Sequence, residues 1–434
     1  MVQSKQRWSR AQVLGLIAIT VALVAFRLTL FNVQSGDYLE YLRDWYERIR
    51  SLGGLEALHH QVGNYAVPYQ FLIALFTYLP LRNLYLYKAL SVTFDIVLAV
   101  YSAKLIHWVH PKINFLVPYT LVLALPTVIL NSSAWGQADS IYTAWLMIAL
   151  WHLLNHQNNR ALVFFGVALA FKLQAILLLP FLFYVYWARR DYRYWYQFGW
   201  VPVTVYAMNL PGFLAGRSLL TPLTIYAGQT SDYKELALNI ANFPKFLQLA
   251  FPTAVLDHYE LLKRGLMVLT CLILLAGFWY LRRLDLTPQR FLVVATWSFW
   301  TCTMFLPSMH DRYSYFVMVM LALVALLDRR MIGVALVSIG ISTVLYLRYL
   351  LNADTAIDLC RWRSSKSSTT VALRRAPSCT RSRSICTVLD VNYSAINDRA
   401  SGNKKLFTPP SIRAMATWVT SARGACLPLS THWR

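Results

Sequence analysis

Residues 161–187 read ALVFFGVALAFKLQAILLLPFLFYVYW, an apolar stretch in which Lys172 is the single charged residue. One membrane crossing needs about 20 apolar residues, so this stretch is longer than a single helix requires. An unpaired Lys near the centre of a membrane helix costs about 3 kcal/mol on insertion scales. One long tilted helix would also put Arg189, Arg190 and Arg193 on the side opposite to the other basic loops. Two short helices that meet near Lys172 at the outer side remove both problems, and the single helix stays the alternative.

The chain keeps this apolar character to about residue 350. Hydrophobic residues make up 57% of the 434 residues, charged residues make up 14%, and the mean hydropathy is positive. One soluble core cannot bury so much apolar surface, and the stretches are too long and too uniformly apolar for barrel strands. We therefore predict an all-α, polytopic membrane protein with about 11 transmembrane helices. The apolar stretches are 11–31, 66–80, 84–106, 113–130, 139–154, 161–187, 197–215, 265–281, 291–307, 313–327 and 331–350.

The net charge of +22 is unevenly placed along the chain. The segment 361–434 has 13 Lys or Arg against Asp390 and Asp398, so it supplies +11, half of the total. The other basic residues gather in short loops between apolar stretches, which is typical of cytoplasmic loops. This placement argues against nucleic-acid binding. The six cysteines have no metal-binding spacing, and we expect neither a metal nor a cofactor.

The basic residues before the first span predict a cytoplasmic N-terminus. Residues 32–83 then form a large first extracytoplasmic loop, and residues 216–260 form a second. Charged residues alternate with aromatic and aliphatic ones through 37–50, which predicts amphipathic helices on the membrane surface. With a hairpin at Lys172, every strongly basic loop lies inside and the acidic or mixed polar motifs lie outside. If the protein is bacterial, this predicts a multi-pass protein of the plasma (inner) membrane.

A membrane domain over 1–350 is followed by a basic tail over 351–434. From about residue 359 the tail is rich in Ser, Arg and Cys and shows no hydrophobic period, so we expect it to be disordered. The change is abrupt and no turn signal precedes it. Our hypothesis is a reading-frame shift near residue 359, with a genuine basic tail as the alternative.

The first candidate site follows the first span in SGDYLEYLRDWYERI, residues 35–49. Asp37 and Asp44 lie seven residues apart, so on an α-helix they share one face, with Glu40 and Glu47 close to it. Asp37 lies nearest the lipid boundary, where it can accept a proton from an acceptor hydroxyl as a general base. Asp44, Glu40 and Glu47 are either acceptor contacts or plain solvated charges.

The second candidate is NSSAWGQADSIY, residues 131–142, between two apolar stretches. Asp139 followed by Ser140 is typical of a helix N-terminus, so simple capping explains part of the motif. The concentration of polar groups exceeds what a cap needs. Trp135 offers a flat face for a sugar, and Gln137 and Asp139 can bind hydroxyl groups.

The third and fourth candidates are FKLQ, residues 171–174, and MHDRY, residues 309–313. A buried Lys needs an anionic partner, so we expect a phosphate or a carboxylate beside Lys172. His310 and Arg312 offer further donors, and Arg binds phosphate oxygens with two parallel hydrogen bonds. Gln174 and Tyr313 complete the predicted sugar or acceptor contacts. The alternative for MHDRY is an interfacial Asp–Arg pair.

These motifs together supply phosphate-binding cations, a hydroxyl-binding loop and a carboxylate on one side of the membrane. A sugar donor carried on a lipid phosphate fits them, because its transfer needs a stabilised phosphate and a deprotonated acceptor. No metal is required if Lys172, His310 and Arg312 neutralise the phosphate. We expect membrane lipids, the polyprenyl-phosphate donor and a lipid-linked or cell-envelope acceptor as partners.

The motifs also resemble those of a known family. They are similar to the GT-C class of integral-membrane glycosyltransferases, most of all to bacterial proteins related to the second mannosyltransferase of GPI-anchor synthesis. The ER glucosyltransferases that use dolichyl-phosphate-glucose are more distantly similar. The matching elements span residues 11–350 and are G-D-Y with a downstream W-Y (36–46), N-Y followed by a Pro (64–68), W-G-Q-A-D-S (135–140), F-K-L-Q (171–174) and M-H-D-R-Y (309–313).

The resemblance implies a glycosyltransferase that moves a hexose, mannose in the first place, from a polyprenyl-phosphate donor to a hydroxyl group. It places the catalytic base on Asp37 and the donor-phosphate contacts on Lys172, His310 and Arg312. Two departures concern local backbone shape. The usual tandem Pro after N-Y is replaced by the run 66–68, Ala-Val-Pro, and Leu173 stands where a Pro or Gln is common.

A transporter or flippase of lipid-linked sugars is the alternative function, because polar groups at broken helices also mark transport pathways. Such a protein is expected to carry ionisable groups near mid-membrane on several helices and to show internal repeats. This chain gathers them on one side and shows no repeat. A non-catalytic assembly scaffold is a third possibility, but it has no need of Lys172.

Overall fold

The computed structural model describes residues 9–231 and 235–351, which are almost entirely helical. The described residues belong to one compact unit. This confirms the predicted all-α class. The hypotheses on the tail, including the frame shift near residue 359, concern residues outside the described part.

The elements up to residue 188 comprise the N-terminal helix, the first loop and the start of a helical bundle. They are α1 (Arg10–Leu28), η1 (Tyr38–Leu42), α2 (Arg43–Ser51), η2 (Gly54–His59), α3 (Val67–Phe76), α4 (Asn83–Val109), α5 (Leu116–Ala124), α6 (Pro126–Ile129), η3 (Leu130–Trp135), α7 (Asp139–Leu154), α8 (Asn158–Phe171), η4 (Leu173–Leu178) and α9 (Leu179–Ala188).

The remaining described elements complete the bundle and the second loop. They are η5 (Tyr192–Gly199), α10 (Trp200–Met208), α11 (Leu210–Leu214), α12 (Thr221–Ser231), β1 (Ala237–Leu238), α13 (Phe243–Ala250), α14 (Pro252–Asp257), α15 (Tyr259–Leu281), α16 (Pro288–Phe305), β2 (Met309–His310), η6 (Asp311–Ser314), α17 (Tyr315–Leu327), η7 (Arg329–Met331) and α18 (Ile332–Leu350).

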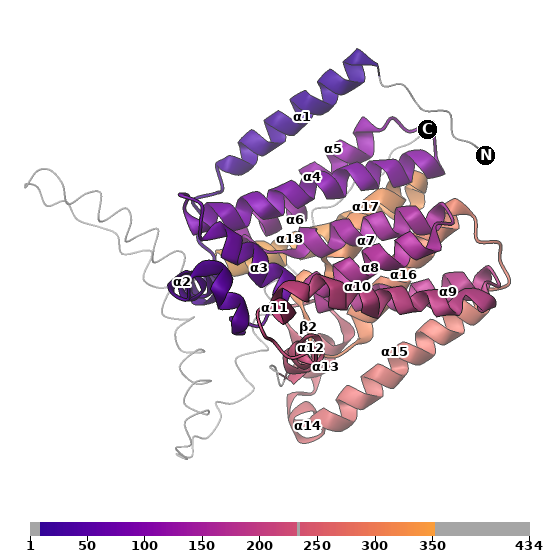
Figure 1. The fold of residues 1–434 in the computed structure, drawn as a ribbon. Coiled ribbons are helices and arrows are strands. Elements are labelled where there is room, and N and C mark those ends of the chain that lie inside the picture. The colour runs from indigo at the N-terminus through magenta and orange to yellow at the C-terminus, as the bar shows by residue number, and fades with distance from the viewer. Residues whose placement is uncertain (1–8, 232–234, 352–434) are drawn as a thin grey trace, which may run out of the picture. The chain divides into compact units, whose positions relative to one another are not determined.

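The bundle is built from helices that run side by side (Figure 1). α4 packs on α5 and α7, α7 packs on α8, and α8 packs on α10, while α16, α17 and α18 contact one another in sequence. The largest apolar core lies among α4, α5, α7, α8, α16 and α17. α1 lies along one edge against α5, and α15 lies along the opposite edge against α16 (Figure 1).

Within the described ranges, four helices are long and apolar enough to cross a membrane. They are α1, α4, α15 and the segment Arg329–Leu350, which joins η7 and α18. A fifth candidate is the pair Leu116–Ala124 and Pro126–Trp135, whose two parts meet at a bend of 56°. Other apolar helices, such as Val67–Phe76, are shorter. The structure thus supports several membrane-spanning helices, and the count of about 11 stays a prediction.

The edge helix α1 presents apolar side chains outward. A capping box begins it, because Ser9 Oγ accepts from the Gln12 backbone N (3.1 Å) and Gln12 Oε1 accepts from the Ser9 backbone N (2.9 Å). Leu14 and Val21 are 65% and 62% exposed. Of the α1 residues, all of which the structure describes, only Arg27 is buried. A helix with this surface is suited to a lipid environment rather than to water.

The apolar stretch 161–187 is broken at Lys172. α8 ends at Phe171, Lys172 has extended backbone angles (φ −153°, ψ 128°), and the 3₁₀ turn η4 follows directly. The alternative of a single long helix is therefore wrong, because the backbone leaves helical geometry where the charged residue occurs.

The two predicted external loops contain short elements of their own. The first loop packs α2, η2 and α3 around a small core that includes Tyr46, Ile49 and Tyr69. The second loop contains α12 to α14 and the strand β1, which pairs in parallel with β2. In that pairing Ala237 lies opposite Met309 and Leu238 opposite His310, so the second loop holds the MHDRY segment in place.

A buried ion pair docks α1 on the bundle. Arg27 Nε lies 3.5 Å from Asp95 Oδ2 of α4, and both side chains are almost fully buried. Arg27 also donates to the Leu123 carbonyl (2.6 Å), and Tyr315 Oη donates to Asp95 Oδ1 (3.4 Å). These contacts give an edge helix with little other burial a fixed position.

We expect the Asp95→Leu substitution to lower the free energy of unfolding by about 3–5 kcal/mol, because it leaves the Arg27 charge buried without a partner. The double substitution Arg27→Met with Asp95→Leu should recover most of that loss. Thermal unfolding of the detergent-solubilised protein measures both effects. Asp44→Leu is a control, since the exposed pair of Asp44 with Arg43 (3.6 Å) contributes little. Equal losses in the single and double variants would contradict the ion-pair explanation.

Candidate functional site

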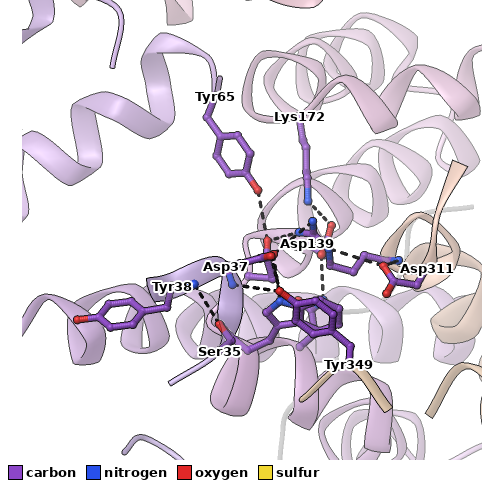
Figure 2. Close-up of polar contacts among 12 residues, drawn as sticks. Ser35, Asp37, Tyr38, Tyr65, Asp139, Lys172, Asp311 and Tyr349 are labelled. Carbon is purple, nitrogen blue, oxygen red and sulfur yellow. Dashed lines mark hydrogen bonds and ion pairs between the residues drawn. The ribbon is translucent and has the colours of Figure 1, made fainter. Parts of the chain in front are cut away.

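Asp37 lies in the first turn of the helix that follows α1. Ser35 precedes that turn, and its Oγ accepts a hydrogen bond from the Tyr38 backbone N (3.2 Å), which is an N-cap interaction. The same Oγ donates to the Trp135 carbonyl (2.8 Å) and so ties this turn to η3. Figure 2 shows Ser35 and Tyr38 beside Asp37. Ser35 therefore fixes the turn that carries Asp37, by one bond within the turn and one bond to η3.

The connection from α1 to Asp37 is held by the buried side chain of Lys88. Its Nζ donates to the carbonyls of Leu30 (2.9 Å), Phe31 (3.1 Å) and Val33 (2.6 Å). These carbonyls belong to the turn that follows the end of α1 at Leu28. Lys88 thus ties the segment between α1 and Asp37 to α4.

The Asp37 carboxylate accepts hydrogen bonds from three side chains and forms an ion pair with a fourth (Figure 2). Tyr349 Oη donates to Oδ1 at 2.5 Å. Trp135 Nε1 donates to Oδ2 at 3.1 Å, and Gln137 Nε2 donates to the same oxygen. Arg312 Nη2 lies 3.4 Å from Oδ2. Segments from the start, the middle and the end of the described chain thus converge on one carboxylate.

Gln137 bridges the groups around Asp37. Gly136 has a positive φ of 78° and ends η3, which turns the chain so that the Gln137 backbone N donates to the Asn131 carbonyl (3.0 Å). Ser91 Oγ donates to the Gln137 carbonyl (2.6 Å). The Gln137 side-chain oxygen accepts from Arg312 Nη1 and from Tyr65 Oη (3.3 Å). One amide therefore binds the acidic and the basic side chain at once.

Arg312 is the positive charge of this cluster. Its side chain is 16% exposed, and its guanidinium lies 5.2 Å from the centre of the Trp135 ring. The backbone N of Arg312 donates to Asp311 Oδ1 (2.8 Å). Burial opposes its charge, but the carboxylates of Asp37, Asp139 and Asp311 raise the pKa of Arg312 above its usual value. The guanidinium is therefore cationic.

Lys172 and Asp139 form a second ion pair next to the first cluster. The Lys172 ammonium contacts Asp139 Oδ1, and both side chains are buried. Asn131 Nδ2 donates to the other Asp139 oxygen at 2.9 Å. Figure 2 shows Lys172 reaching toward Asp139 from the broken segment. The anionic partner that the sequence requires for Lys172 is thus a carboxylate of the protein, that of Asp139.

The MHDRY segment brings two more titratable groups to the site. Burial and the positive charge of Arg312 lower the pKa of His310 to about 4, so the imidazole is neutral at pH 7. Burial raises the pKa of Asp311 to about 6 despite the adjacent Arg312. The His310 and Tyr313 rings lie 5.2 Å apart. His310 therefore offers a hydrogen bond rather than a charge.

Most residues predicted from the sequence gather here, and Asp44 does not. Its side chain is 66% exposed and pairs with Arg43. The turn Tyr38–Leu42 is π-helical, so the seven-residue spacing from Asp37 no longer returns to the same face. Trp135 is buried and its ring stacks on Tyr349 (4.2 Å between centres, 17° between planes), so its polar edge rather than an open face points to the site.

The network also contains residues that were absent from the predicted site residues. They are Lys88, Ser91, Asn131, Tyr65 and Tyr349. Asn131 and Tyr65 lie within motifs that the sequence singles out, so their polar side chains were a usable signal. Tyr349 lies in an apolar stretch with many aromatic residues, and no local pattern distinguishes it.

The arrangement is suited to proton transfer beside a bound anion. A partly exposed carboxylate, two cations and several neutral donors lie together at the ends of apolar helices. In the part of the chain that the structure describes, no group of three or more His, Cys, Asp or Glu residues could hold a metal ion.

Comparison with known proteins gives no assignment: no protein-family model matches the chain, and no curated protein matches it significantly.

We expect the His310→Gln variant to lose less stability in acid than the wild type. The unfolded chain binds a proton to His310 below about pH 6.5, whereas the folded chain does so only near pH 4. The wild type therefore loses about 1–3 kcal/mol from this group as the pH falls across that range. Asp311 acts oppositely below about pH 6, but both proteins share its contribution. Unfolding free energies in detergent between pH 7 and 4.5 measure the difference, and identical pH dependences would contradict it.

Proposed function

We propose that this protein is a membrane glycosyltransferase that moves a hexose, in the first place mannose, from a polyprenyl-phosphate donor to a hydroxyl group. The acceptor is lipid-linked or part of the cell envelope. Asp37 is the general base, and Arg312, Lys172 and His310 bind the donor phosphate. The proposal rests on the motif resemblance together with the contacts of these side chains.

The observation that carries the proposal is the contact between Asp37 and Arg312. A carboxylate and a guanidinium, 3.4 Å apart and joined by Gln137, form the centre of a polar cluster in an apolar bundle. Buried charges of this kind are costly and mark functional sites in membrane proteins. A base beside a phosphate-binding cation is what glycosyl transfer from a phosphate donor requires.

In the proposed step, the donor phosphate binds Arg312 in place of the Asp37 carboxylate, which thereby loses its ion pair. Asp37 accepts the proton of the acceptor hydroxyl while the acceptor oxygen forms a bond to the anomeric carbon. The bond from that carbon to the phosphate oxygen breaks, and its electron pair remains on the phosphate. The cationic side chains stabilise this leaving group.

The other predicted contacts have graded roles in this proposal. Lys172 exchanges part of its interaction with Asp139 for the phosphate, and neutral His310 donates a hydrogen bond to it. Gln137 and Asp139 bind sugar hydroxyls, with Gln174 and Tyr313 at the side of the site formed by the MHDRY segment. Asp44 lies on the exposed face of the first loop, where it can contact only an acceptor that extends over that face.

The topology is part of the proposal. The short apolar segments, including Asn158–Phe171 and Leu173–Ala188, cross or enter the membrane together with the long helices. The proposed total stays at about 11 membrane segments, as the apolar stretches of the sequence predict. Basic loops such as 189–193 and 282–283 lie in the cytoplasm with the N-terminus. The site lies on the extracytoplasmic side, of the plasma (inner) membrane if the protein is bacterial.

We expect Asp37→Asn to lower mannosyl transfer by about 10²–10⁴-fold, which is the usual contribution of a general base. The assay measures transfer from polyprenyl-phosphate-mannose by the purified protein, with a cell-envelope lipid fraction as acceptor source. Glu56→Gln is the matched control, because Glu56 is an exposed carboxylate of the same first loop. Undiminished transfer by the Asn variant would remove Asp37 from this role.

The protein reconstituted in proteoliposomes distinguishes the proposed transferase from a flippase. A flippase moves the lipid-linked sugar between the leaflets of the proteoliposome without consuming it. Translocation of intact donor without any transfer product would contradict the proposed activity and support the flippase.

We expect Arg312→Gln to raise the donor KM by about tenfold or more and to lower kcat/KM by about 10²–10³-fold, because the phosphate loses its charged partner. Arg312→Lys should recover only part of this, since an ammonium lacks the bidentate geometry. Arg50→Gln, at an exposed position of the first loop, is the control. A donor KM equal to that of the wild type would show that the phosphate binds elsewhere.

A further inference from the structure

The hydroxyl group of Tyr349 makes two contacts with one residue. It donates to Asp37 Oδ1 at 2.5 Å and accepts from the Asp37 backbone N at 3.0 Å. Tyr349 lies in the last turn of α18, and Asp37 lies in the first turn after α1 (Figure 2). The two bonds fix both the backbone and the carboxylate of Asp37.

The Tyr349 ring also positions a second donor to the same carboxylate. It stacks on Trp135 with 4.2 Å between ring centres, and Trp135 Nε1 donates to Asp37 Oδ2 at 3.1 Å. Tyr349 therefore fixes the position of Asp37 Oδ1 directly and that of Oδ2 through the Trp135 indole. Two fixed donors on opposite oxygens hold the carboxylate plane in one orientation.

Gly36 permits this close approach. A Cβ atom at residue 36 would lie 3.0 Å from Tyr349 Oη and 3.7 Å from its Cζ. The first distance is tighter than ordinary van der Waals contact, so a side chain here would push the tyrosine hydroxyl away from Asp37. Gly36 therefore leaves the space that the Tyr349 hydroxyl group occupies beside Asp37.

We propose that Tyr349 is the positioning residue for Asp37, and that it sets the orientation in which the carboxylate accepts the acceptor proton. This inference rests on the proposed glycosyltransferase function. Asp37 can rotate about its side-chain bonds toward Arg312, which draws it by charge. The tyrosine hydroxyl holds Oδ1 away from that cation and keeps one oxygen available when the donor phosphate engages Arg312.

Packing alone does not explain the Tyr349 hydroxyl group. Tyr346, one turn earlier on α18, also packs on Trp135, at 5.2 Å with the rings at 87°. Its hydroxyl is buried and has no hydrogen-bond partner within the described residues. The aromatic ring is therefore sufficient for docking α18 on η3, and only the hydroxyl of Tyr349 is directed at the carboxylate.

The test compares Tyr349→Phe with the matched control Tyr346→Phe in the full-length protein. Tyr349→Phe keeps the stacked ring and removes the two bonds to Asp37, so we expect kcat to fall between about 10- and 100-fold with the donor KM unchanged. Tyr346→Phe should leave kcat within about twofold of the wild type. Thermal unfolding in detergent establishes that both variants are folded. Equal kcat values for the two variants would overturn the proposal.

A double-substitution cycle with Gly36 tests the same contact independently. Gly36→Ala alone should lower kcat, because the new methyl group displaces the tyrosine hydroxyl. In the Tyr349→Phe background the same change should have little further effect, because the hydroxyl it meets is absent. Multiplicative losses would show that the two residues act separately. If the wild type transfers no sugar, the proposed function fails; if the wild type is active and Tyr349→Phe is normal, only the positioning role fails.

Discussion

The ion pair between Asp37 and Arg312 is the constraint on which the arrangement of the site depends. Both side chains are largely shielded from water (16% exposed for Arg312 and 19% for Asp37), so leaving either charge without a partner is costly. Gln137 is hydrogen-bonded to both partners of the pair, and the turn at Gly136 determines the position of Gln137. The start of the first loop, the turn before α7 and the segment after α16 must therefore meet at one point.

The same requirement governs the other buried charges. Lys172 occurs where the helical backbone breaks, and it pairs there with Asp139 at the start of α7. Arg27 pairs with Asp95 and thereby fixes α1, the helix from which the chain continues to Asp37. Charge pairing thus links helices whose apolar surfaces alone would permit several relative positions. It explains why an edge helix that buries only Arg27 can still hold the Asp37 carboxylate in a defined place.

The sequence predicted the polar contacts of the site only where a single charged residue in or beside an apolar stretch is energetically costly without a partner. Lys172 demanded a break and an anion, and both are present; Asp37 followed a span directly, and it lies at the centre of the cluster. Asp44 lies outside the cluster because a π-helical turn changes the periodicity, which no residue in that turn announces. Tyr349 could not be found, since its contact joins positions 312 residues apart in the chain. The count of about 11 membrane helices stays a prediction, because apolar composition does not tell a full crossing from a short buried helix.

The closed ion pair restricts the chemistry of any ligand that enters the site. A neutral molecule that separates Asp37 from Arg312 removes their charge–charge interaction without replacing it, whereas an anion can replace the carboxylate at the guanidinium. The released carboxylate keeps its hydrogen bonds from Tyr349, Trp135 and Gln137, and a hydroxyl group can donate to it where Arg312 was. A ligand set of one anionic group and one hydroxyl therefore satisfies both halves of the pair at once, and a phosphate-linked sugar with an alcohol acceptor is such a set. In the proposed scheme the base becomes free only after the anion has bound, so the Asp37–Arg312 ion pair determines the order of binding.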